Sequence, residues 1–373
     1  AELNIMDGVT SSATELNLLD GATSLATNVN GLSDALIETY SIHIGNDPSS
    51  TTDGARYNVA VGVTALDAVT TGDNNVALGY DALTANTTGS YNTAVGKSSL
   101  FANTTGGNNT AVGLSSLYTN TTGNFNTSQG VQSMFANTTG GYNTAAGYTS
   151  LYANTTGSAN TAQGFQSLYE NTTGDKNTAQ GYSSLFKNTT GDKNTAQGFG
   201  SLYNSTTGDE NTAVGYYSLK TNTTGYSNVA IGNDALYANT TGFYNNAMGD
   251  GAGDVITTGS NNVILGYGSD PSAAAASNQI VVGATAVGHG DNITVIGNTD
   301  MTAWHPADDN GVDLGSSSYE FKDLYVDGTA YVDALDLNGT AVSATAAELN
   351  IMDGVTATAT ELNLIDGVTA TTA

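Results

Sequence analysis

The sequence has 373 residues, of which 46 are glycine and none is cysteine, and its formal net charge is −27. Seven basic residues against 34 acidic ones provide no basic surface to displace counterions from phosphates, so neither nucleic acid nor an anionic membrane surface is expected as a partner. Without cysteine there are no disulfides or thiolate metal sites, and the absence of a run of about 18 apolar residues argues against membrane insertion.

Residues 1–23 carry a short repeat that begins with ELN and starts again at Glu15 after its first copy at Glu2. Each copy places two apolar residues three apart, such as Leu16 and Leu19, ahead of an Asp-Gly pair. This pattern predicts one helical turn followed by an extended link. Residues 1–23 therefore form a separate segment of ELN repeats.

Residues 24–40 predict a short parallel coiled coil. The apolar residues have 4-3-4 spacing and Ser24 stands where a helix N-cap is expected; the stripe consists of Leu25, Val29, Leu32 and Leu36. Such a segment would hold several chains together ahead of the repeats that follow.

A 17-residue repeat occupies residues 41–297. The phrase NVAVG at Asn58 recurs at every seventeenth residue as far as NVILG at Asn262. One further copy lies on each side, at Ser41 and Gln279, and the spacing then falls to 14 for a last copy. A repeat without insertions over this length means that each copy stacks directly on the previous one. The sequence therefore predicts a solenoid.

Within one copy, residues 93–96 and 98–102 predict two short strands, and residues 103–106 predict a turn closed by glycine. The fold class is therefore all-β: a parallel β-roll, or β-solenoid, whose successive strands pair at about 4.8 Å. Counting from the Asn of the phrase, like residues stack as ladders of Asn at position one, Leu or Met at position nine and Tyr or Phe at position ten. The fourth position, usually aliphatic, is an amide at Gln129, Gln163, Gln180 and Gln197, and the last three predict an amide ladder.

A single coil has little apolar surface to bury. Even if Ala94, Val95, Leu100 and Phe101 were all buried, their transfer free energy would not offset the conformational entropy of ordering the whole coil. This imbalance predicts an obligate oligomer, and identical chains lying side by side are most simply arranged with cyclic symmetry.

The C-terminal part divides at about residue 343. Residues 298–342 lack the 17-residue repeat, whereas residues 343–373 return to the ELN repeat, as Glu348 and Glu361 show. The same repeat at both ends is the pattern expected of a segment within a longer repetitive fibre.

Three motifs resemble known fibrous proteins. The phrase NTAVGxxSLxxNTTG resembles the left-handed parallel β-roll repeats of trimeric autotransporter adhesin heads, the YadA-head type, and is similar to longer-period versions in bacteriophage tail fibres. GVDLGSSSYEFKDLYVDG, within residues 298–342, resembles a shaft element of phage tail fibres, and ATELNLLDG resembles the ELNxLDGVT repeats of marine-phage structural proteins. The resemblance implies a homotrimeric fibre.

Aromatic residues at the variable sixth position are candidates for contact with sugars. They form a strip of rings in consecutive coils, Tyr148, Phe165, Tyr182, Phe199 and Tyr216. One interpretation is a stacked surface for host cell-surface glycans, and the other is packing between chains of the fibre. The second is the simpler interpretation.

A row of N-x-T sequons recurs on the same edge of ten coils, at Asn86, Asn103, Asn120, Asn137, Asn154, Asn171, Asn188, Asn204, Asn222 and Asn239. The structural interpretation is a turn in which Asn and Thr bind the backbone before a glycine. The alternative is a row of N-linked glycans, which would require a host with the appropriate transferase.

No catalytic, metal or cofactor site is expected. Gly96-Lys97-Ser98 resembles the end of a phosphate-binding loop, but Tyr91 stands where that loop requires glycine. His43 and the two other histidines lie in different segments without a second imidazole at ligand spacing, so one would bind a metal only where three copies met on a trimer axis.

The leading functional hypothesis is a phage tail-fibre segment that acts as a stiff trimeric spacer in the virion, with a role in host attachment through surface glycans or another receptor. The alternative is a trimeric adhesin or extracellular filament at a cell surface. A carbohydrate-active fibre enzyme is the weakest hypothesis, because the coils repeat no pair of carboxylates.

Overall fold

The computed structural model describes residues 35–38, 41–44, 54–305, 313–330, 336–337 and 340–341. The chain divides into two compact units, Ala1–Ala303 and Trp304–Ala373. The ELN repeats of residues 1–23 and 343–373 lie outside the described residues.

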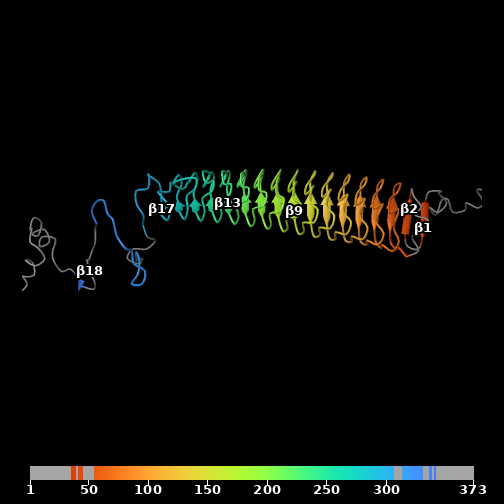
Figure 1. Cartoon of the computed structure of the whole chain (residues 1–373), viewed down its shortest axis with the longest axis horizontal. Helices are drawn as coiled ribbons and strands as arrows, with labels where there is room; N and C mark the ends of the chain where they lie inside the picture. The colour runs from red at the N-terminus through yellow and green to blue at the C-terminus, as the bar shows by residue number, and fades with distance from the viewer. Residues whose placement is uncertain are drawn as a thin grey trace, which may run out of the picture. The chain divides into compact units, whose positions relative to one another are not determined.

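The first unit contains one 17-stranded sheet (Figure 1). Strand β1 (Ala35–Glu38) pairs antiparallel with β2 (Ser41–Ile44), and β2 to β17 then pair in parallel in chain order. The remaining strands have three residues each: β3 Val59–Val61, β4 Val76–Leu78, β5 Thr93–Val95, β6 Thr110–Val112, β7 Thr127–Gln129, β8 Thr144–Ala146, β9 Thr161–Gln163, β10 Thr178–Gln180, β11 Thr195–Gln197, β12 Thr212–Val214, β13 Val229–Ile231, β14 Asn246–Met248, β15 Val263–Leu265, β16 Ile280–Val282 and β17 Thr294–Ile296.

Each strand pairs with the strand one repeat later. Thr93 lies beside Thr110, for example, and the same offset of one full repeat holds for each pair from β2 to β16. The last pair, in which Ile280 lies beside Thr294, has the shorter offset that the sequence shows there. The predicted parallel solenoid with 17-residue coils is therefore confirmed.

The alternation of side chains places the middle residue of each strand from β3 to β16 inside the coil. In β5, Ala94 is fully buried, whereas Thr93 and Val95 on either side keep exposed surface. Gly96 follows with φ +129°, and a Cβ atom there would lie 2.6 Å from the carbonyl oxygen of Gly113. Only glycine therefore lets consecutive coils approach closely at this corner.

The second predicted strand of each coil is wrong. Residues 98–102 form a turn in which Ser98 and Leu100 have left-handed φ values of 55° and 50°. A leucine in this conformation costs on the order of 1 kcal/mol. Full burial of the Leu100 side chain and the 3.0 Å bond from its N–H to the Ser116 carbonyl offset this cost. The turn is needed because a 17-residue coil must close, and Phe101 is consequently only partly buried.

Two amide ladders run through the interior beside the buried leucines. At position one, Asn75 Oδ1 accepts from the backbone N–H of Asn92 at 3.0 Å, and Asn92 Nδ2 donates to the Gly106 carbonyl at 2.9 Å. At position twelve, Asn103 Nδ2 donates to Asn86 Oδ1 at 2.7 Å and to the same Gly106 carbonyl at 2.9 Å. Buried amides are thus bonded both within a coil and between coils. The predicted ladder at position one is confirmed.

The N-terminal end of the sheet is covered by an antiparallel strand. Leu36 and Ile37, which fall in the predicted coiled coil of residues 24–40, belong to β1 and pair with β2. A helix is therefore not formed at residues 35–38, because pairing with the end of the sheet provides their backbone hydrogen bonds. Residues 24–34, 39 and 40 lie outside the described residues.

The described residues of the second unit bury little of their apolar surface. Ser316 and Tyr319 form an isolated antiparallel bridge, and β18 (Asp336–Leu337) pairs antiparallel with β19 (Thr340–Ala341). Exposed fractions of 65% to 89% are found for the large apolar side chains Leu314, Tyr319, Phe321, Leu324 and Tyr325.

Candidate functional site

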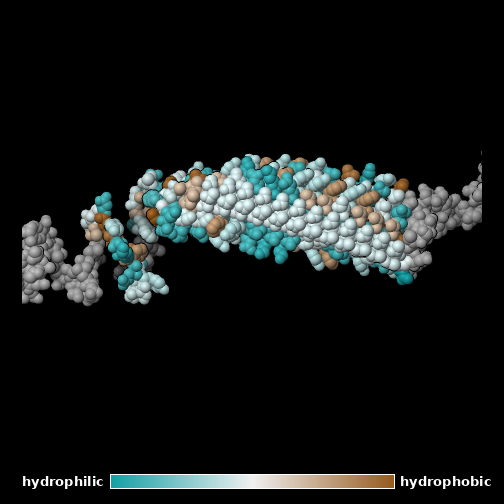
Figure 2. Space-filling view, viewed as in Figure 1, coloured by the Kyte–Doolittle hydropathy of each residue, from teal (hydrophilic) through white to brown (hydrophobic). Residues whose placement is uncertain are grey.

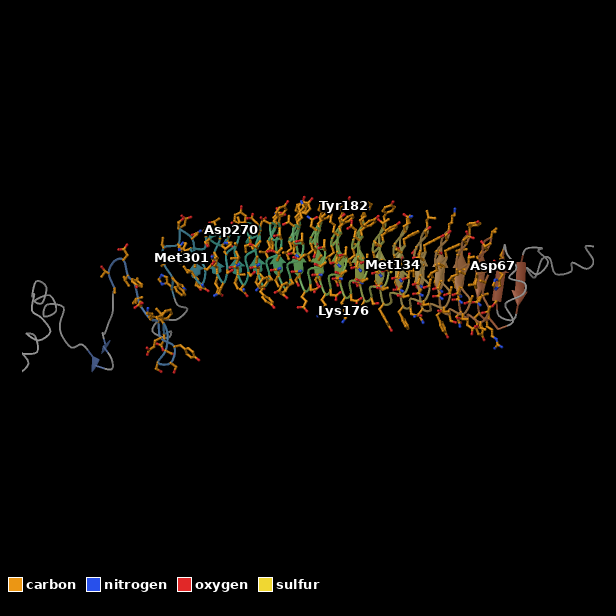
Figure 3. The ribbon with its side chains drawn as sticks, viewed as in Figure 1. Asp67, Met134, Lys176, Tyr182, Asp270 and Met301 are labelled. Carbon is orange, nitrogen blue, oxygen red and sulfur yellow. The ribbon has the colours of Figure 1, made fainter. Side chains whose placement is uncertain are left out.

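The predicted aromatic strip lies along one edge of the roll. Tyr182 points outward from this edge and Lys176 from the opposite one (Figure 3). The rings stack in succession with centroid separations of 4.8 to 5.4 Å and interplanar angles of 8° to 16°, in the order Tyr148, Phe165, Tyr182, Phe199 and Tyr216. We call these five residues the sixth-position strip.

The geometry of the sixth-position strip limits what it can bind. Its side chains are 38% to 49% exposed. The faces between consecutive rings are covered by the rings themselves, so the strip presents ring edges and tyrosine hydroxyls outward. An apolar C–H surface of a sugar packs on the negative face of an aromatic ring rather than on its edge. The arrangement favours packing of the rings on one another over stacking with sugars.

A compact cluster closes the strip at its C-terminal end. The ring of Tyr217 lies 4.2 Å from that of Tyr216 and edge-on to Phe199 at 5.4 Å. Lys220 Nζ lies 3.7 Å from the Tyr217 ring centroid. Gly200 makes room for this ring, because a Cβ atom there would overlap with it. A hydrogen bond with Tyr217, followed by desolvation, raises the pKa of Tyr216.

Sequence reasoning did not identify this cluster. The available signal was the aromatic residue Tyr217 at the seventh position, which is small or polar in most coils, together with Gly200 in the same position one repeat earlier.

A second aromatic ladder follows the tenth position. Its rings stack at 4.9 to 5.3 Å in the order Phe101, Tyr118, Phe135, Tyr152, Tyr169, Phe186 and Tyr203. These side chains are only partly exposed, and desolvation is the main cause that raises the pKa of Tyr169. The predicted tenth-position ladder is confirmed.

The sequon row lies inside the coils. The side chains are fully buried at Asn86, Asn103, Asn120, Asn137, Asn154, Asn171, Asn188, Asn222 and Asn239. Their Nδ2 atoms, to which a glycan would be attached, donate to carbonyl oxygens of the same coil, as in the 2.9 Å bond from Asn154 to Gly157. Asn204 is partly exposed, because Ser205 takes the ladder position instead. The geometry favours the structural interpretation, and we do not propose glycosylation.

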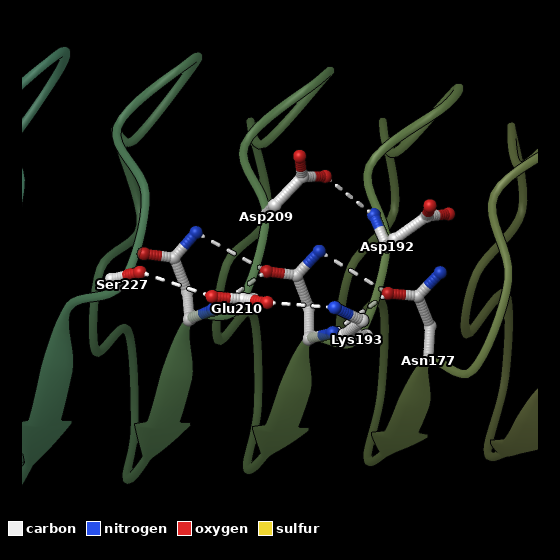
Figure 4. Close-up of polar contacts among 8 residues, drawn as sticks. Asn177, Asp192, Lys193, Asp209, Glu210 and Ser227 are labelled. Atoms are coloured by element: carbon white, nitrogen blue, oxygen red, sulfur yellow. Dashed lines mark hydrogen bonds and ion pairs between the residues drawn. The ribbon is translucent and has the colours of Figure 1, made fainter.

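Charged residues gather on the edge opposite the sixth-position strip. Asp209 Oδ1 accepts from the backbone N–H of Asp192 at 2.7 Å, and Lys193 Nζ lies 2.7 Å from Glu210 Oε1 (Figure 4). The hydrogen bond between the last two raises the pKa of Lys193 and lowers that of Glu210. Figure 2 shows a pale band along the roll, with strongly polar and strongly apolar side chains gathered toward its edges.

One half-buried carboxyl group takes the place that a buried leucine has in most coils. Asp270 stands at position nine, where most coils have leucine, and burial followed by the charge of Asp254 raises the pKa of Asp270 to about 6. Burial also raises the pKa of Asp254, with a further contribution from Asp234. Among the described residues, no group of three His, Cys, Asp or Glu side chains is arranged to hold a metal ion.

The structure also places the residues of the suspected phosphate loop and the histidine of the first coil. Lys97 lies over the Tyr80 ring at 5.6 Å, and Ser98 occupies the left-handed turn, so they do not form a phosphate loop. His43 is buried in β2. Within the residues that the structure describes, no helix has the length and apolar character needed to cross a membrane.

Comparison with known proteins found no matching family model, no similar curated protein and no similar solved structure.

Proposed function

We propose that this chain is a structural segment of a fibre, in which copies of the chain lie side by side and act as a stiff spacer. The observation that carries the proposal is the uninterrupted parallel pairing from β2 to β17, with no insertion between coils. Fifteen steps of about 4.8 Å give a roll roughly 70 Å long. Backbone bonds and amide ladders along this axis oppose bending and stretching.

Exposed apolar surface supports an assembly of several copies. Leu324 and Tyr325 in the second unit are 77% and 89% exposed in the single chain. A soluble protein does not normally leave such side chains in water when a partner can cover them. Three copies are the number that the resemblance to trimeric fibres implies.

The shaft-like motif and the ELN repeats support a phage tail fibre that takes part in host attachment, placed in the virion. The second candidate, a trimeric adhesin or filament at a cell surface, is favoured by the resemblance of the 17-residue repeat to adhesin heads. We assign no catalytic activity, because the repeated coils resemble a mechanical element and their aromatic ladders are accounted for by packing.

The mass and shape of the purified protein test this proposal. We expect light scattering to give three times the chain mass of 37.7 kDa, and electron micrographs to show rods. A stable folded monomer at all concentrations would contradict the fibre proposal. Antibody labelling of phage particles or of bacterial surfaces then separates the two candidate locations.

A further inference from the structure

The outward side of the sheet is free of charged residues. We call the first and third residues of strands β3 to β17, together with Ile42 and Ile44 of β2, the outer sheet face. None of these residues is Asp, Glu, Lys, Arg or His. The charged side chains of the roll lie in its turns, as Lys97, Asp192 and Glu210 illustrate. In a chain with a net charge of −27, this long uncharged strip distinguishes the outward side of the sheet from the turns.

The composition of the outer sheet face changes along the roll. The third strand residues are aliphatic toward the N-terminal end, at Val61, Leu78, Val95 and Val112. They are apolar again toward the C-terminal end, at Val214, Ile231, Met248, Leu265, Val282 and Ile296. Between them lie Gln129, Ala146, Gln163, Gln180 and Gln197. Two apolar stretches thus flank one stretch that is rich in amides.

The dimensions suit an interface with a second copy of the chain. A strip about 70 Å long and about 10 Å wide offers roughly 700 Å² on each copy, so two copies would bury roughly 1,400 Å², within the range of stable interfaces. Two copies repel each other through their net charge. They can approach closely only at a surface where no charged side chain has to be desolvated. A second roll of the same period is also the partner that can contact every coil in the same way.

We infer that the outer sheet face is the surface through which copies of this chain pack, and that Gln163, Gln180 and Gln197 set their register. The inference rests on the proposed fibre function. Gln197 Nε2 donates to Gln180 Oε1 at 3.1 Å, which leaves one N–H of that amide free to bond across the interface. Copies in register place amide against amide. A shift of several coils places amides against aliphatic side chains, and each buried unpaired amide disfavours that register.

Two aspartate substitutions test the surface. Leu78 lies on the outer sheet face and Leu114 at the sixth position, and both are 46% exposed. We expect Leu78→Asp to raise the concentration needed for assembly at least tenfold, whereas Leu114→Asp assembles like the parent. Circular dichroism checks that each variant is folded. Equal assembly of the two folded variants would overturn the inference and leave the fibre proposal intact, whereas a monomeric parent would remove the fibre proposal itself.

Cysteine cross-linking tests the surface without disturbing it, because the chain has no cysteine of its own. Under mild oxidation, Val61→Cys should give a covalent dimer within the assembly if copies are parallel and in register. Mixing Val61→Cys with Val282→Cys chains tests the antiparallel arrangement, which would link the two different chains. Absence of all these links in an assembled protein would overturn the inference.

Cross-linking between shifted positions tests the role of the glutamines. Cysteines at positions 61 and 95 lie two coils apart, about 10 Å, which is too far for a disulfide between chains in register. Mixed Val61→Cys and Val95→Cys chains, one carrying a size tag, should therefore form links only between like chains. When Gln163, Gln180 and Gln197 are all replaced by Val, we expect links between unlike chains to appear. An unchanged pattern would show that the glutamines do not set the register.

Discussion

Asn188 and Ser205 occupy successive places in one interior ladder, and the Oδ1 atom of Asn188 lacks a hydrogen-bond donor because the shorter Ser205 side chain replaces the amide found in neighbouring coils. The Ser205 hydroxyl is itself buried without a partner. One substitution in a periodic ladder therefore leaves two buried polar atoms unsatisfied.

Restoring the amide should stabilise the roll. We expect Ser205→Asn to raise the free energy of unfolding by about 1 to 2 kcal/mol, because it supplies the missing donor to Asn188. Urea unfolding measures the change. Asn171→Ser is the matched control: it removes the donor to Asn154 and should lower stability by a similar amount. A destabilising effect of Ser205→Asn would contradict this account of the ladder.

Deleting one whole repeat should preserve the fold. Removal of residues 143–159 joins Tyr142 to Asn160, which is the neighbour that the next coil requires, and we expect an assembled roll shorter by about 4.8 Å. Deletion of Ala153 alone should lower the melting temperature more, because it shifts every ladder of that coil. Electron microscopy and thermal melting compare the variants. A harmless single deletion together with a whole-repeat deletion that abolishes folding would refute the stacked-coil architecture.

The two aromatic ladders should differ in their contribution to stability. Replacing Phe101, Tyr118, Phe135 and Tyr152 by Ser should destabilise the folded assembly more than replacing Tyr148, Phe165, Tyr182 and Phe199, because the tenth-position rings are more buried. Thermal melting of the two quadruple variants measures the difference. Equal losses would mean that both ladders lie in equivalent environments in the assembly.

The stability of the C-terminal coils should depend on pH through Asp270. Its pKa of about 6 lies above the 3.8 that is usual for an aspartate, so the folded state binds the proton more tightly than the unfolded chain does. The resulting stabilisation is complete below about pH 4 and is lost as the pH rises through about 6. Asp254 is the charged group that faces it, and Asp234 adds to the same negative field.

Asp270→Asn should therefore raise the melting temperature at pH 7 to 8 and flatten its fall between pH 4 and 6. The expected gain is of order 1 kcal/mol after allowance for solvent screening. The exposed Asp300→Asn is the control and should leave the profile unchanged. A parent profile without a slope in this window would contradict the role of Asp270.

The period of the repeat was enough to predict the fold. It was not enough to predict the backbone path within one coil. Ala94 and Asn92 recur with a spacing that only stacking explains, so their ladders follow from the sequence. The pair Leu100 and Phe101 is equally compatible with a strand and with a turn, and closure of the coil rather than local propensity selects the left-handed turn.

For the candidate surfaces too, the period of the repeat predicts some contacts and leaves others open. Stacking of Tyr182 on Phe199 follows from their separation by one repeat. The contact between Tyr217 and Gly200 depends on the direction of a ring that no periodic pattern specifies. Burial of the sequon amides also required the coil geometry, because an Asn-Thr-Thr-Gly turn has the same sequence whether its amide points inward or outward.

The constant one-repeat offset between bonded strands has a consequence for how this chain reaches its native state. Sheet proteins usually fold slowly, because distant parts of the chain must meet before favourable contacts offset the loss of conformational entropy. Here each new coil needs only the coil before it, which gives a relative contact order of about 0.07 over the length of the roll, in the range of helical bundles. Once copies of the chain have come together, the roll should therefore order quickly and coil by coil.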